Sequence, residues 1–228
     1  MSKALTFARE PHRRGMVRVE SWWGRAFLRA IEELAYDDNQ LSGARSLARS
    51  GRIGGLVVEP GRFAAAVDDE RGLWTVTGMV PVLGAESVAA LLEVLGAASA
   101  RAEALLVGEL PLDVAEHAEE AGVELVPYGD ELAVTCTCGH WHAVCGHSLA
   151  VLHQLCWIVD RDASALLHLR GAERDELLGR LRRGLRQDRP AGPAATDVAA
   201  PGESTRDQVD DVEIALDAVL RARHLLEE

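Results

Sequence analysis

The stretch IGGLVVEPGRFAAAVDDERGLWTVTGMVPVL, residues 53–83, decides the fold class of this chain. Apolar runs at 53–58 and 63–67 flank Glu59-Pro60-Gly61-Arg62, which is typical of a hairpin turn. The segment DDERG then leads into a third run, whose apolar members are Trp74, Val76, Met79 and Val80. Because strands joined by such short turns pair antiparallel, the stretch predicts a small β-meander.

Helical patterns surround this sheet in the sequence. Residues 21–36 open with a capping-type serine and then repeat apolar side chains at helical spacing. Further helices are expected at 41–51, 87–106 (one or two helices), 112–121, 148–159, 163–171 and 173–187. Brief strands are expected at 123–127 and 132–138. The combination predicts an α+β fold with helices packed on an antiparallel sheet.

The chain divides into three regions by composition. Residues 1–188 read as one globular α+β region, which contains a cysteine- and histidine-rich segment at about 132–158. Residues 189–205 are rich in Pro, Ala and Gly and predict a flexible linker. Residues 206–228 predict a C-terminal amphipathic helix.

Charge and hydropathy narrow the classes of function. The net charge is −12 and the isoelectric point is about 5.1, whereas generic polyanion binders carry a basic excess. Residues 73–135 are the acidic part, with a single arginine against 11 carboxylates. The first residues show no apolar signal segment, and no run reaches the ~18 apolar residues of a membrane span. We therefore expect a cytoplasmic protein, in which clustered cysteines are metal ligands or catalytic thiols before disulfides.

The segment CTCGHWHAVCGH, residues 136–147, holds three of the four cysteines. Cys136 and Cys138 stand two apart at the end of an expected strand, so both side chains leave the same face. Cys145 and His147 stand two apart where a helix is expected to begin. Three thiolates and one imidazole fill the tetrahedron that Zn²⁺ prefers. The spacing predicts one structural Zn²⁺ in a closed strand–turn–helix site, with a redox cluster as the alternative.

Other residues near this cluster have simpler interpretations. His140 and His142 flank Trp141 and are expected to be exposed spacer residues, although either could replace His147 as a ligand. Cys156 falls at helical spacing within an apolar stripe and is expected to be a small core residue rather than a ligand.

Two clusters elsewhere have both a structural and a functional interpretation. Trp22 and Trp23 fit core packing at helical spacing, with a partner-binding anchor as the alternative. A group of arginines stands at the end of the last globular helix, where a solvated helix terminus is the simple explanation and a phosphate or acidic-partner patch the other. These arginines are Arg180, Arg182, Arg183 and Arg186.

The pattern Cys136-x-Cys138, a spacer, then Cys145-x-His147 resembles the SWIM zinc finger. Over about residues 18–187, the segments SWWGRAFLRAIEEL, ARSLARSGRIGGLVVEPGRFAAAV and LLHLRG also resemble bacterial SWIM zinc-finger proteins, which occur beside SWI/SNF-type helicases. That family commonly has Lys between the last Cys and His, where this chain has Gly146. The missing cation weakens a nucleic-acid role for the finger itself.

The resemblance implies a non-enzymatic zinc-binding adaptor that contacts a protein partner, a SWI/SNF-type helicase, with DNA reached directly or through it. A direct DNA-binding protein is the alternative, supported by the arginine-rich N-terminal part and residues 180–189. A zinc hydrolase is the remote alternative, because it needs an open coordination position and a general base. The local candidates for that base are His140, His142 and Glu131.

Overall fold

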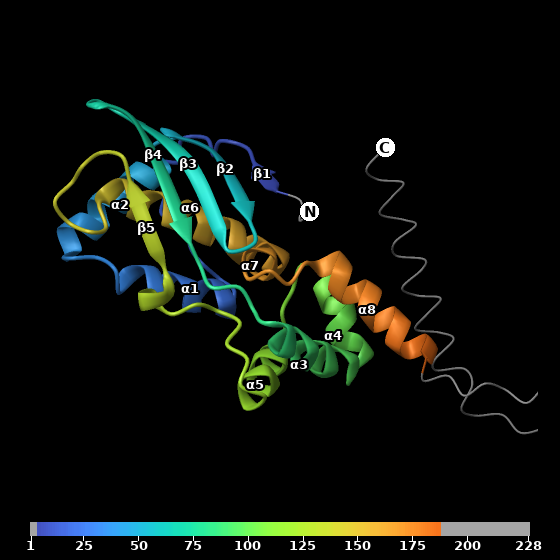
Figure 1. Cartoon of the computed structure of the whole chain (residues 1–228). Coiled ribbons are helices and arrows are strands. Elements are labelled where there is room, and N and C mark those ends of the chain that lie inside the picture. Colours follow the sequence, from blue (N-terminus) through green and yellow to red (C-terminus); the bar gives the residue numbers. More distant parts are fainter. Residues whose placement is uncertain (1–3, 188–228) are drawn as a thin grey trace, which may run out of the picture.

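The computed structural model describes residues 4–187, and Figure 1 shows a twisted sheet with helices behind and beside it. Five strands pair antiparallel in the order of the chain. They are β1 Leu5–Phe7, β2 Ile53–Glu59, β3 Arg62–Asp69, β4 Gly72–Met79 and β5 Ala133–Cys136. The α+β class and the three-strand meander are confirmed. Strand β1 was not predicted, because three residues carry too little alternation to be recognised.

Both the turn residues and the buried side chains of the strands favour the meander. Gly61 takes φ 74° in the β2–β3 turn, a conformation that favours glycine. Phe63 and Val67 of β3 are buried against the helices. On β4 the ring of Phe63 lies directly over Gly78, where an added Cβ would come within 2.1 Å of the ring. Met79, an apolar member of this strand, faces the solvent with 65% of its surface exposed.

One helix forms the centre of the core. Helix α6, Gly146–Arg161, is buried over nearly its whole circumference and contacts the sheet at β3, β4 and β5. Helices α1, Trp22–Glu32, and α2, Asp38–Arg49, also pack against α6. Ser21 and Asp37 cap these two helices through their side chains. The metal-ligand candidates at the start of α6 are therefore attached to the buried central helix of the core.

The remaining helices extend the core away from the cluster. They are α3 Ala85–Gly96, α4 Ser99–Leu106, α5 Leu112–Glu120, the 3₁₀ turn η1 Gly129–Glu131, α7 Ala163–Leu169 and α8 Arg174–Gln187. Helix α7 contacts β2, the 3₁₀ turn η1 contacts α1, and α3, α4, α5 and α8 pack against one another at the end of the molecule shown at the lower right of Figure 1. The expected helix at 87–106 is thus two helices, and α8 continues through Gly179 without a break.

The strand predicted at 123–127 is absent, and the segment pairs with no strand. Val123 and Leu125 are buried, which explains the strand-like alternation. The Arg170 guanidinium takes the place of a neighbouring strand, donating to Glu124 O at 2.9 Å and to Pro81 O at 2.6 Å. A buried side chain therefore satisfies the carbonyl that a ladder would otherwise use.

The two tryptophans play different parts. Trp23 is buried and its Nε1 donates to Val159 O at 2.7 Å, which ties α1 to α6. Trp22 is half-buried and its Nε1 donates to Leu110 O at 2.6 Å. The structure therefore places Trp23 in the core and Trp22 at its edge. The linker expected at 189–205 and the helix expected at 206–228 lie outside the described residues.

Candidate metal centre

The first ligand pair stands at the end of β5. Cys136 pairs with Val76 of β4, and Thr137 continues the pairing through its backbone N–H, which donates to Thr75 O at 3.1 Å. The sequence had predicted Cys138 in the strand, but it lies in the turn that follows. Gly139 takes φ 64° and lets the chain turn immediately after it.

The second pair stands at the start of α6. Cys145 is the N-cap residue, and its Sγ accepts from the Ser148 backbone N–H at 3.4 Å. His147 lies in the first turn of the helix. Because the amino end of a helix carries a partial positive charge, this position favours a thiolate. The predicted helix start is confirmed.

The two pairs converge on one point. The Sγ atoms of the three cysteines and a ring nitrogen of His147 lie within 4.8 Å of one another. Cys136 Sγ is 3.9 Å from His147 Nδ1. Tetrahedral Zn–S and Zn–N bonds of about 2.0–2.3 Å place donor atoms roughly 3.5–3.8 Å apart, so a small contraction closes the site. The Cys₃His set fits a single metal ion in number, chemistry and spacing, as expected for a zinc finger.

Asp69 orients the histidine, and the sequence did not reveal it. Its Oδ2 lies 2.9 Å from His147 Nε2, so the carboxylate accepts that N–H and leaves Nδ1 facing the cysteines. Its Oδ1 accepts from Trp74 Nε1 at 3.0 Å and from the Arg71 N–H at 2.8 Å. These hydrogen bonds, from Trp74 first and then His147, hold the pKa of Asp69 well below its usual range. The carboxylate is thus an ionised acceptor fixed in the β3–β4 turn.

The thiols differ in their readiness to ionise. Burial raises the pKa of Cys136 to about 12. Burial also opposes ionisation of Cys145, but hydrogen bonds from Ser148 outweigh it and lower the pKa of that thiol. Neighbouring thiolates repel one another, so ionising all three cysteines requires a bound cation.

The other candidate ligands lie outside this group of donor atoms. His140 is exposed as predicted, whereas His142 is half-buried, and their rings stack at a centroid distance of 5.3 Å. Glu131 Oε2 accepts from the Tyr128 N–H at 2.9 Å in the η1 turn. Cys156 is fully buried, with its pKa raised to about 12 by burial, and its Sγ contacts Gly24 O at 3.5 Å. Cys156 is a core residue, as predicted.

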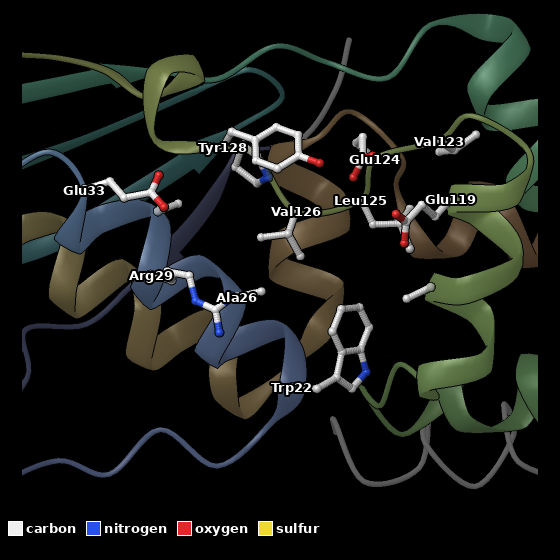
Figure 2. Close-up of a pocket in the computed structure, with 13 residues that line it drawn as sticks. Trp22, Ala26, Arg29, Glu33, Glu119, Val123, Glu124, Leu125, Val126 and Tyr128 are labelled. Carbon is white, nitrogen blue, oxygen red and sulfur yellow. The ribbon is translucent and has the colours of Figure 1, made fainter.

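Two hollows accompany these elements. A groove of about 420 Å³ runs beside the cluster between α2 and the β3–β4 turn, and Cys138, His147 and Arg71 are among its lining residues. A second cavity of about 320 Å³ lies between α1 and the 123–128 segment, and Figure 2 shows Trp22 and Val126 on its apolar walls. The residues that line this second cavity include no cysteine, histidine or serine, so it offers no metal ligand of these kinds.

Comparison with known proteins gives one informative match. The chain is similar to the uncharacterized protein Rv2102 of Mycobacterium tuberculosis, with 31% identity over 193 residues. The matched region covers 84% of this chain and 66% of that protein, so the chain spans just under two thirds of its relative's length. No family model matches the chain, and no solved structure matches it. Among the described residues, no helix has the length and apolar character to cross a membrane.

Proposed function

We propose that this protein is a non-enzymatic zinc-binding adaptor whose SWIM-type finger is structural. The convergence of three Sγ atoms and one histidine nitrogen within 4.8 Å carries the proposal. Four protein ligands fill a tetrahedral Zn²⁺, and such a closed site leaves no position for a reacting water. Asp69 supports the same role, because it holds His147 in the tautomer that ligates through Nδ1. The ion would join β5 to α6 across a short loop.

The proposed partner is a protein, and the resemblance to bacterial SWIM proteins favours a SWI/SNF-type helicase. The resemblance rests on the Cys136-x-Cys138 and Cys145-x-His147 pairs together with the segments around α1 and β2. A reducing cytoplasm would keep the three thiols available for the metal. Affinity purification of the full chain from its native cell, followed by mass spectrometry, tests the partner. Recovery of no helicase above the level seen with an untagged control would contradict that assignment.

Cobalt substitution tests the closed site directly. Full-length protein loaded with Co²⁺ should show the intense visible bands of a tetrahedral ion and thiolate-to-metal absorption from three sulfurs. One ion per chain is expected by metal analysis of the zinc form. A weak five- or six-coordinate spectrum would instead indicate an open position with bound water, which is the arrangement that a hydrolase needs.

Direct DNA binding is the second candidate, and the ion pairs of the described residues weigh against it. Arg45 pairs with Glu32, Arg62 with Glu59, and Arg180 with Glu176. Each of these arginines has a carboxylate partner, which reduces the net positive charge that these positions offer to phosphates. A gel-shift titration over salt separates the candidates, because affinity for phosphates falls steeply as salt rises. Binding of duplex DNA that weakens steeply with salt would favour direct DNA binding over the adaptor function.

A further inference from the structure

Two exposed aromatic side chains meet beside the cysteine–histidine cluster. Tyr36 follows α1 and is 70% exposed, and Trp141 lies in the spacer between the ligand pairs and is 79% exposed. Their ring centroids are 6.2 Å apart, and the ring of His142 lies 4.3 Å from Tyr36. We call Tyr36, Trp141 and His142 the aromatic platform. Neighbouring aromatic rings that are exposed to solvent are typical of an interaction surface.

The platform is held in place from three sides. Its spacer loop is anchored at one end by Cys138 and at the other by Cys145, both members of the metal cluster. Between them, Gln40 Nε2 donates to Val144 O at 2.9 Å. The same side chain accepts from the Tyr36 N–H at 2.8 Å through its Oε1. One glutamine therefore links the two halves of the platform, and a bound metal would fix the loop that carries Trp141.

The residues that adjoin the platform in the chain are acidic. The sequence holds no Lys or Arg at 30–44 or at 102–160, the two segments that supply its rings. Asp37 and Asp38 follow Tyr36 directly in the chain, and both are exposed. The groove on the His140 side carries Arg71, so the acidic side is the one next to Tyr36. Aromatic faces and carboxylates together attract cations and repel phosphates.

We propose that the aromatic platform binds an arginine or lysine side chain of a basic segment in a partner protein. The cation lies against the faces of Tyr36 and Trp141, and the nearby carboxylates neutralise its charge. The inference rests on the proposed adaptor function and names the chemistry of the partner. It also predicts that the metal and the partner are coupled, because the loop between Cys138 and Cys145 presents Trp141 only when its ends are held.

Calorimetric titration of the full, zinc-loaded chain with two synthetic peptides tests the proposal. One peptide alternates arginine and glycine, and its twin carries citrulline, the neutral isostere, in place of each arginine. The arginine peptide should bind, and the citrulline twin should bind several-fold more weakly. Trp141→Ala should weaken the arginine peptide about two- to fivefold, the range of one exposed cation–π contact. The matched control is Tyr128→Ala, which removes an aromatic ring that is 56% exposed and lies outside the platform.

Three results would overturn the inference: equal binding of the two peptides, unchanged binding by the Trp141→Ala variant, or an equal loss in the Tyr128→Ala control. Binding of single-stranded oligothymidylate that disappears in the Trp141→Ala variant would also overturn it, since the platform would then stack bases. Zinc content measured on the same samples distinguishes a failure of this inference from a failure of the proposed adaptor function. A chain with full zinc and no peptide binding overturns this inference alone, whereas a chain that binds no zinc overturns the adaptor as well.

Discussion

Asp69 and His147 are 78 residues apart in sequence, and the carboxylate of one lies 2.9 Å from the Nε2 of the other. The contact joins the β3–β4 turn to the first turn of α6, and the Trp74 ring stacks on the imidazole at a centroid distance of 6.1 Å. The histidine ring therefore has its tautomer and its plane set before a metal arrives. Such preorganisation is what distinguishes a ligand from a histidine that is merely close to cysteines.

Replacing Asp69 by asparagine should weaken zinc binding about 10–100-fold, the usual effect of losing the carboxylate behind a metal-bound histidine. The amide keeps an oxygen for the turn hydrogen bonds but removes the negative charge that strengthens the ligand. A competition titration with a fluorescent chelator measures the change. The matched control is Asp68→Asn on the same turn, because Asp68 is exposed and outside the cluster. Equal losses in the two variants would show that the charge acts only at long range.

Replacing Cys138 by serine should remove most of the bound zinc and lower the melting temperature, because three ligands hold Zn²⁺ less tightly than four. The control is Cys156→Ser, which alters the buried thiol of α6 and should leave zinc near one ion per chain. Plasma emission spectrometry of the purified proteins gives the stoichiometry. If the Cys156 variant lost the metal and the Cys138 variant kept it, the ligand assignment would be wrong.

His153 should make the protein less stable at acidic pH. Its side chain is 3% exposed, and burial, together with the charge of Arg45, lowers its pKa from 6.5 to about 4. Between pH 6.5 and 4, His153 is therefore protonated in the unfolded chain but neutral in the folded chain. The free energy of unfolding is highest above pH 6.5 and falls as the pH drops through this window. The loss attributable to His153 is about 2 kcal/mol at pH 5.

Urea unfolding of the wild type and a His153→Leu variant at pH 7 and pH 5 isolates this contribution. Metal release at low pH affects both proteins, so the difference between their two pH slopes reports the histidine. The variant should lose less stability than the wild type on acidification. Identical slopes would mean that the imidazole is hydrated in the folded state.

Two glycine substitutions should change the free energy of unfolding in opposite directions. Gly78→Ala places a Cβ within 2.1 Å of the Phe63 ring and should destabilise the protein by about 1–3 kcal/mol through overpacking. Gly43→Ala, inside α2 with no atom within 4 Å of the added Cβ, should stabilise it by about 0.5–1 kcal/mol. Chemical denaturation of the two variants beside the wild type measures both. A neutral Gly78→Ala would mean that the Phe63 ring can move aside.

Local patterns predicted a large part of this molecule. Residues 53–69 form their hairpin because turn residues and alternating apolar residues are close in sequence and act together. The same holds for the ligand pairs, since a spacing of two residues is read without any knowledge of the fold. Helix starts at Ser21 and Cys145 also follow from local chemistry, in which a side chain caps the first free amides.

Only the tertiary structure decided the contacts between distant segments. Asp69 meets His147 and Tyr36 meets Trp141 because β3, α6 and the α1–α2 connection pack in one particular arrangement. The segment 123–127 alternates like a strand, yet the side chain of Arg170, 46 residues further along the chain, donates a hydrogen bond to the Glu124 carbonyl. The sequence by itself determined which residues could bind a metal, because ligation depends on local spacing. The packing of helices on the sheet determined how those ligands are oriented and which surface they support, because both depend on residues brought together from about 80 to 100 positions away.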